Sequence, residues 1–181
     1  KVGNFGILGC FSFYPTKNLG SIGDAGAITT NNKTLYKKLI KLREYGWDNN
    51  KQSIFIGRNA RLDELQSGFL NISLNYLLKN NKERNQIADR YFKSLNNKFF
   101  KLPYYEKNHN YNVFHLFVVQ TNKRNKLIEY MKKNKINLGI HYELPCHKHL
   151  AFRKFKNNQI SLKKTEQLSK KIVSLPIYPG L

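Results

Sequence analysis

The chain has 181 residues and a formal net charge of +21, and at this length a core can form without disulfides. Hydrophobic residues make up 40% and aromatic residues 13%, which is typical of a folded protein and excludes a disordered one. The sequence contains no run of about 18 apolar residues, so it predicts no membrane-spanning helix. Cys10 and Cys146 stand outside any CxxC pattern, which argues against a disulfide scaffold or zinc ribbon and favours a reducing cytoplasm.

Basic residues outnumber acidic ones by 32 to 11, a feature of nucleic-acid-binding proteins. Of these 32 residues, 25 are Lys and only 7 are Arg, and the lysines are spread along the chain together with 23 Asn. Arg, which contacts guanine and phosphate in a bidentate manner, is not enriched. We therefore favour a solvated, lysine-rich surface, and a basic nucleic-acid-binding module is the alternative.

The first third of the chain predicts two strands and a helix. Residues 4–14 are apolar and aromatic, and residues 25–30 form a second short run of strand type. Between them lies a segment rich in turn-forming residues. A helix is expected over residues 34–46, with Asn31 or Asn32 as its N-cap.

A long helical pattern follows, over about residues 60–95. Asp63 and Glu64 would lie in its first turn, where the helix dipole favours acidic side chains. Its apolar positions recur at helical spacing and predict an inner face made of Leu62, Leu65, Phe69, Ile72 and Tyr76. A helix of this length often links two domains, so we expect one domain over residues 1–95 and a second over 96–181.

The second domain is expected to alternate strands and helices. Residues 111–121 and 136–142 have the composition of strands, and residues 123–134 and 163–174 have that of helices. This alternation predicts an α/β or α+β unit, and we favour the α/β class.

Lys17 is the residue with the clearest chemical context. It lies in a loop between two predicted strands, with the hydroxyls of Ser12, Tyr14 and Thr16 before it and glycines after it. Such a lysine is suited to contact a phosphate or to form a Schiff base. The glycines that a P-loop requires before its lysine are absent.

Four stretches, in order, carry a family resemblance. They are SFYPTKNLGSIGDAGAITT from residue 12, GRNARLDELQ from residue 57, HYELPCHKHLAF from residue 141 and LSKKIVSLPIYPGL from residue 168. Together they resemble the DegT/DnrJ/StrS sugar aminotransferases, which use pyridoxal 5'-phosphate (PLP) and have the aspartate-aminotransferase fold, fold type I. The resemblance implies that the chain is the second half of the large domain plus most of a truncated small C-terminal domain, and that the N-terminal half is missing.

The resemblance also implies the roles of the cofactor-binding residues. Lys17 would be the catalytic Schiff-base lysine, and its neutral amine would move a proton between the substrate Cα and the cofactor. Ser12 would bind the cofactor phosphate. Asn59 would reach the phosphate of the other subunit's cofactor in a homodimer, although a role as the cap of the following helix is equally physical. Arg61 could likewise contact the phosphate or have a structural role at the start of the helix.

Substrate-binding residues are implied in the same way. Tyr14, His141 and Tyr142 resemble residues that line the nucleotide-sugar site, and Lys51 is a partner for the substrate diphosphate. The role of His147 stays open. A metal site is not expected, since the spacing of His141, His147 and His149 is not that of structural zinc.

The implied function is transfer of an amino group from an amino acid, expected to be glutamate, to a nucleotide-linked keto-deoxy sugar for surface polysaccharide biosynthesis. Lys at position 17 favours transamination, since family members with His there are dehydratases. The residues that pair with the pyridine nitrogen and stack on the ring would come from the missing half, so we expect the chain alone to be inactive. An inactive truncated remnant is a further alternative.

Overall fold

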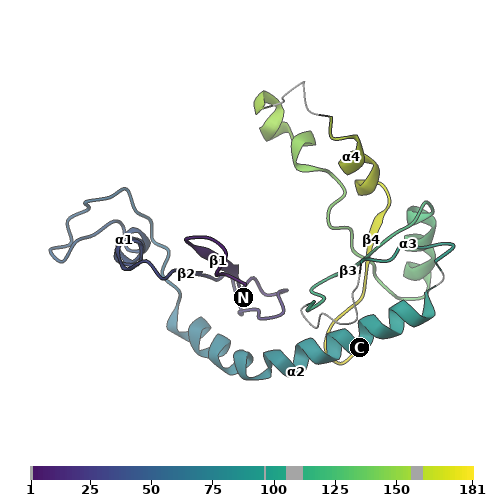
Figure 1. Ribbon diagram of the computed structural model, residues 1–181, viewed down its shortest axis with the longest axis horizontal. Helices are drawn as coiled ribbons and strands as arrows, with labels where there is room; N and C mark the ends of the chain where they lie inside the picture. The colour runs from purple at the N-terminus through teal and green to yellow at the C-terminus, as the bar shows by residue number, and fades with distance from the viewer. Residues whose placement is uncertain (1, 96, 105–111, 156–160) are drawn as a thin grey trace. The chain divides into compact units, whose positions relative to one another are not determined.

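The computed structural model describes residues 2–95, 97–104, 112–155 and 161–181. The chain divides into two compact units, Lys1–Leu78 and Lys79–Leu181 (Figure 1). The division falls inside helix α2 (Glu64–Ser94), earlier in the chain than the expected boundary near residue 95. No helix in the described ranges is long and apolar enough to cross a membrane.

The first unit begins with a small antiparallel sheet followed by a helix. Strand β1 (Gly9–Ser12) pairs with β2 (Gly26–Thr29), with Cys10 opposite Ile28. Helix α1 (Lys33–Arg43) comes next, and its N-cap is Asn32, whose side chain accepts a hydrogen bond of 3.0 Å from the Leu35 amide. The predicted cap at this position is therefore confirmed.

Residues 57–60 are held against the end of α1 by backbone hydrogen bonds. The Tyr45 amide donates to the Arg58 carbonyl at 3.0 Å, and the Arg58 amide donates to the Leu42 carbonyl at 2.9 Å. Asn59 forms an isolated antiparallel bridge with Glu44. Because this segment is extended, α2 begins at Glu64 and not near residue 60, so Asn59 is not its N-cap.

The second unit holds another antiparallel pair, β3 (Phe117–Gln120) and β4 (Ile172–Leu175). Helix α3 (Arg124–Lys133), two short 3-10 helices (Cys146–Lys148 and Leu150–Phe155) and helix α4 (Lys163–Ser169) lie between them in the chain. All strand pairs in the described part of the chain are antiparallel.

Two expected elements of this unit are wrong. The expected helix over 163–174 ends at Ser169, because the following apolar residues pair as β4 with β3. The expected strand over 136–142 is reduced to one bridge between Gly139 and Ser174. The expected strand over 111–121 is β3, which begins only at Phe117, and residue 111 itself lies outside the described residues.

The hydrophobic core lies in the second unit, between the C-terminal part of α2 and the β3–β4 pair. Phe117 lies at the centre of the core and is inaccessible to solvent. The ring centroids of Tyr91 and Phe92 on α2 lie 4.9 and 5.1 Å from the centroid of its ring. The buried cluster consists of Ile87, Ala88, Phe114, Phe117, Val119, Val173, Leu175 and Ile177.

Two side chains of α2 fasten the segment after β4 to this core. Arg84 is buried, and its Nη1 donates to the carbonyls of Ile177 at 2.8 Å, Phe114 at 3.2 Å and His115 at 3.4 Å. The Tyr91 hydroxyl donates to the Pro176 carbonyl at 2.7 Å. Burial lowers the pKa of Arg84 below its ordinary value.

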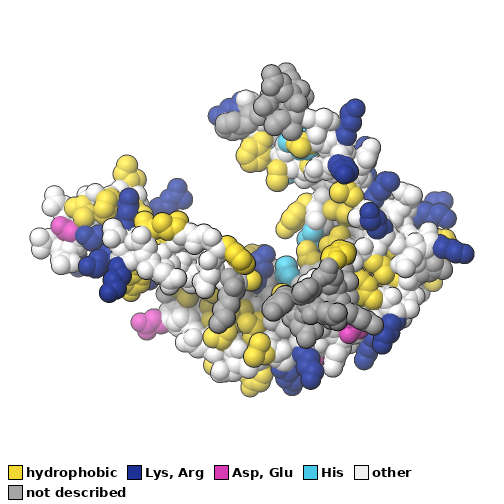
Figure 2. Space-filling model, in the orientation of Figure 1, with side chains coloured by type: hydrophobic (Ala, Val, Ile, Leu, Met, Phe, Trp, Pro, Cys, Tyr) yellow, Lys and Arg dark blue, Asp and Glu magenta, His cyan; other side chains and the backbone are white. Residues whose placement is uncertain are grey.

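The predicted inner face of α2 is mostly uncovered in this chain. Leu65 is 76% exposed and Ile72 is 63% exposed, whereas Leu70, which was not among the expected inner residues, is buried. Hydrophobic side chains are visible on the surface of this part of α2 in Figure 2. Lys and Arg side chains are scattered in the same view and do not form one stripe.

Candidate active site

The turn that follows β1 brings three of the predicted site residues together. Ser12 is the last residue of β1, and its hydroxyl accepts a hydrogen bond of 3.3 Å from the Tyr14 amide. The Lys17 amide donates to the Tyr14 carbonyl at 2.8 Å. The Lys17 side chain is half-buried, while Ser12 and Tyr14 are exposed. An amine, a phenol and a hydroxyl therefore share one short turn.

This turn is braced against α2 by Ser21. The Ser21 amide donates to the Phe13 carbonyl at 2.8 Å, and its buried hydroxyl donates to Gln66 Oε1 on α2 at 2.8 Å. Gly20 lies so close to the Pro15 carbonyl that a Cβ would collide with it. No local sequence signal points to Gln66, since its partner is 45 residues away.

Lys51 and Asn59 lie in the loop between α1 and α2. The Lys51 amide donates to the Asp48 carbonyl at 3.1 Å, and its side chain is exposed. In the described part of the chain, no hydrogen bond or ion pair joins Lys51 or Asn59 to the Lys17 turn. Arg61 lies over the ring of Tyr45, with its guanidinium 5.8 Å from the ring centroid.

The other predicted substrate residues belong to the second unit. Nδ1 of His141 is 2.8 Å from the Ser174 hydroxyl oxygen, and Tyr142 is 74% exposed. The next residue, Glu143, accepts a hydrogen bond of 3.0 Å from Nη2 of the buried Arg124. Neither Ser174 nor Arg124 was expected from the sequence to support this segment.

His147 belongs to an ion-pair cluster with Lys148 and with Glu166 of α4. Its Nε2 is 3.0 Å from Glu166 Oε1, and Lys148 Nζ is 3.0 Å from the same oxygen. The hydrogen bond from His147, followed by that from Lys148, lowers the pKa of Glu166 below its ordinary value. Among the residues described, no group of three or more His, Cys, Asp or Glu side chains could hold a metal ion.

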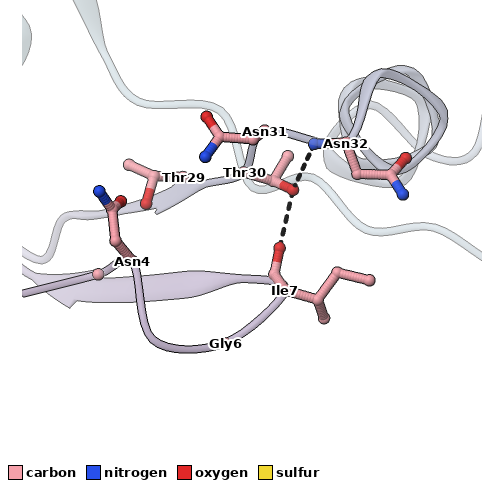
Figure 3. A pocket seen from close by; sticks show the side chains of 8 residues that line it. Asn4, Gly6, Ile7, Thr29, Thr30, Asn31 and Asn32 are labelled. Atoms are coloured by element: carbon pink, nitrogen blue, oxygen red, sulfur yellow. Dashed lines mark hydrogen bonds between the residues drawn. The ribbon is translucent and has the colours of Figure 1, made fainter.

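Two cavities of the first unit lie apart from these residues. One of about 390 Å³ is lined by Asn and Thr side chains, two glycines and Ile7, between the segment before β1 and the start of α1. There the Thr30 hydroxyl donates to the Ile7 carbonyl at 2.8 Å and accepts from the Asn32 amide at 3.1 Å (Figure 3). The other, of about 850 Å³, is mainly apolar and lies among the β1–β2 pair, α1 and residues 56–62. Neither is lined by a predicted site residue.

The donor set of the Lys17 turn fits a phosphorylated aldehyde cofactor. A primary amine is the side chain that condenses with an aldehyde, and a hydroxyl at the end of a strand can donate to a phosphate. The chain provides both within six residues, Ser12 to Lys17, in a turn fixed by backbone hydrogen bonds.

Comparisons with known proteins identify the family of this chain. The family model of the DegT/DnrJ/EryC1/StrS aminotransferase family matches residues 1–181. A relative from Aneurinibacillus thermoaerophilus, a dTDP-3-amino-3,6-dideoxy-alpha-D-galactopyranose transaminase, is 42% identical over 99% of this chain and 48% of its own length.

Two solved structures give the same result. Streptomyces venezuelae DesV, in complex with a ketimine intermediate, is 35% identical with a TM-score of 0.89, over 96% of this chain and 47% of its own. The Bacillus subtilis NtdA protein, with bound cofactor PMP, is 30% identical with a TM-score of 0.85, over 98% and 42%. The chain spans about half the length of the relatives it matches. It belongs to the DegT/DnrJ/EryC1/StrS aminotransferase family.

Proposed function

We propose that the protein containing this chain is a PLP-dependent aminotransferase that acts on a nucleotide-linked sugar. It transfers an amino group from an amino acid, expected to be glutamate, to a keto-deoxy sugar that is used in surface polysaccharide biosynthesis. Relatives named as transaminases of dTDP-linked and UDP-linked sugars support this proposal. In this proposal the first 95 residues belong to the large PLP-binding domain of fold type I and the remainder to the small domain.

The observation that carries the proposal is the braced turn from Ser12 to Lys17. Lys17 is half-buried and its backbone is fixed by the Tyr14 carbonyl, so the side chain starts from a defined position. The Ser21–Gln66 hydrogen bond holds the far end of the same loop. A preorganised amine of this kind is what covalent catalysis on a carbonyl requires.

PLP, when bound, supplies an electron sink for the bonds at the substrate Cα. In the proposal, Ser12 donates a hydrogen bond to the cofactor phosphate. Lys17 Nζ would hold the cofactor and, once released and neutral, would move a proton between the substrate Cα and the cofactor. Ser12 is exposed, so its hydroxyl hydrogen can point toward an anion while its oxygen accepts a hydrogen bond from the Tyr14 amide.

Substrate binding is assigned to side chains that reach solvent. Tyr14 is 50% exposed and Tyr142 is 74% exposed, and both can stack on or hydrogen bond to a nucleotide sugar. Lys51 is exposed, and its ammonium suits the diphosphate. His141 is the fourth substrate residue.

Homodimer formation is part of the proposal because Asn59 of the partner subunit would reach the cofactor phosphate. Asn59 is exposed and its backbone is fixed by the bridge with Glu44, so its side chain can serve a neighbouring subunit. The exposed apolar residues of α2, such as Leu65 and Ile72, are compatible with burial in a larger assembly.

Borohydride trapping tests the proposed role of Lys17. The protein containing this chain is incubated with PLP, reduced with borohydride and digested, and the modified lysine is located by mass spectrometry. We expect one pyridoxyl group, on Lys17. Lys17→Ala should abolish both the labelling and transamination, whereas Lys33→Ala, on exposed α1, should leave both unchanged. Equal labelling of the Lys17→Ala variant would refute the assignment.

A subunit-mixing experiment tests the proposed role of Asn59. Lys17→Ala and Asn59→Ala proteins are mixed under conditions where subunit exchange is verified by mass. If each site takes Lys17 from one subunit and Asn59 from the other, heterodimers contain one intact site. Part of the wild-type activity should then return. Exchange without any recovery would contradict the shared site.

A further inference from the structure

The segment that carries His141 is attached to the edge of β4. The Gly139 amide donates to the Ser174 carbonyl at 3.2 Å, and the Ser174 amide donates to the Gly139 carbonyl at 2.8 Å. These two bonds form the isolated bridge between Gly139 and Ser174. Since β4 contains the buried Val173 and Leu175, the segment is anchored to the core of the second unit.

The His141 ring folds back onto this bridge. Its Nδ1 is 2.8 Å from the Ser174 hydroxyl oxygen. A Cβ added at Gly139 would lie 2.6 Å from Cε1 of the same ring, so a side chain at position 139 would displace the imidazole. The backbone of Gly139 does not have positive φ, and the contact with the ring is therefore what favours glycine here.

Ser174 is 4% exposed, and its only side-chain hydrogen bond among the described residues is to His141. A buried hydroxyl without a partner is costly, and an alanine would pack against Val173 and Leu175 without that cost. The hydroxyl is thus explained by the imidazole. The ring makes no other hydrogen bond in the part of the chain that the structure describes, and His141 is exposed, so Nε2 remains available to a ligand.

We propose that Ser174 and Gly139 are positioning residues that orient His141 toward the nucleotide sugar. The Ser174 hydroxyl donates to Nδ1, which keeps the ring proton on Nε2, and Nε2–H then donates to a hydroxyl or phosphate oxygen of the substrate. Gly139 leaves the space in which the ring can take this orientation. The inference rests on the proposed nucleotide-sugar function and adds two residues that do not touch the substrate themselves.

A double-mutant cycle in the protein containing this chain tests the coupling, with dTDP-glucose as the probe and calorimetry as the measurement. Ser174→Ala and His141→Ala should each weaken binding, by roughly tenfold for the loss of one hydrogen bond. The double variant should bind no more weakly than His141→Ala alone. Additive losses, or no loss in either single variant, would overturn the proposal.

Three further measurements separate this orientation from a purely structural role. Nitrogen NMR should show the Nε2–H tautomer of His141 in the wild type and a mixture in Ser174→Ala. Gly139→Ala, which keeps the hydroxyl, should weaken binding to a similar extent. Ser169→Ala removes another buried hydroxyl of the same unit, one that donates to the Glu166 carbonyl, and should leave binding unchanged.

The outcome for the proposed function is read separately. If borohydride trapping on Lys17 fails, the aminotransferase proposal fails whatever the NMR result is. If trapping succeeds but the His141 tautomer and the binding constant do not respond to Ser174→Ala or Gly139→Ala, only the positioning proposal is wrong. Should Ser174→Ala fail to fold, as judged by circular dichroism, the Gly139→Ala variant decides in its place.

Discussion

The two units of this chain are stabilised in different ways. In the second unit, eight hydrophobic residues form a buried cluster around Phe117. In the first unit, Leu70 is the only buried hydrophobic residue among those described, and no residue of α1 is buried. The first unit is held mainly by backbone hydrogen bonds and caps, yet it carries Lys17. The unit with the proposed catalytic lysine is therefore the one with less hydrophobic stabilisation of its own.

The largest expected effect is in amide hydrogen exchange of the 181-residue chain. Amides of β3 and β4 should exchange more slowly than those of β1 and β2 by a factor of about 100 or more, because opening the core unit exposes the Phe117 cluster. Hydrogen exchange with mass spectrometry measures both pairs in one sample. Equal protection of the two pairs would show that the first unit has a stability that its burial does not explain.

Truncation of one aromatic residue in each unit should sharpen the difference. Phe117→Ala removes a ring that is 0% exposed and should lower the free energy of unfolding of the second unit by about 3–5 kcal/mol. Phe5→Ala, a matched change at a residue that is 91% exposed, should alter stability by no more than about 0.5 kcal/mol. Urea unfolding followed by circular dichroism gives both values, and similar losses would contradict the comparison.

The first unit should instead be sensitive to loss of a helix cap. Asn32→Ala removes the acceptor of the Leu35 amide and should cost about 1 kcal/mol, measured as faster exchange of the first-turn amides of α1. Asn31→Ala, one position earlier and without a capping bond, is the control. If the first-turn amides exchange at the same rate in both variants, the Asn32 cap does not stabilise α1.

The smallest expected effect is a pH dependence in the second unit. His147 and Lys148 lower the pKa of Glu166 in the folded protein. The ionised carboxylate therefore stabilises the fold at pH values above the ordinary glutamate pKa, and this stabilisation is lost as the pH falls through the pKa of the folded state. Glu166→Gln should therefore flatten the decline in thermal stability below about pH 4.5. Glu129→Gln, on the exposed side of α3, should keep the wild-type slope.

Local signals were sufficient for the cap of α1, most of the helices and the Lys17 turn, but not for the start of α2, where Asn59 is not the cap. The Asn32 cap, Glu64 in the first turn of α2 and the grouping of Ser12, Tyr14 and Lys17 depend on neighbours within a few residues. Short apolar runs were more difficult, because periodicity over four residues does not separate a helix end from a strand. For this reason the predicted helix over 163–174 includes residues that form β4 in the structure.

Long-range partners could not be predicted from spacing. Ser174 lies 33 residues from His141, and Gln66 lies 45 residues from Ser21, so their hydrogen bonds become visible only when the chain is folded. The late start of α2 has a similar origin, because backbone bonds to the end of α1 hold residues 57–60 in an extended form. Sequence motifs predict the chemical groups of the proposed site, and the fold shows which distant residues contact them.

The hydrogen bonds of Arg84 and Tyr91 to the segment that follows β4 set practical limits for protein engineering. A truncation after Leu175 would remove the Pro176 and Ile177 carbonyls, leaving a buried guanidinium with fewer acceptors and a phenol without its acceptor. A deletion that starts at Pro176 should therefore destabilise the second unit.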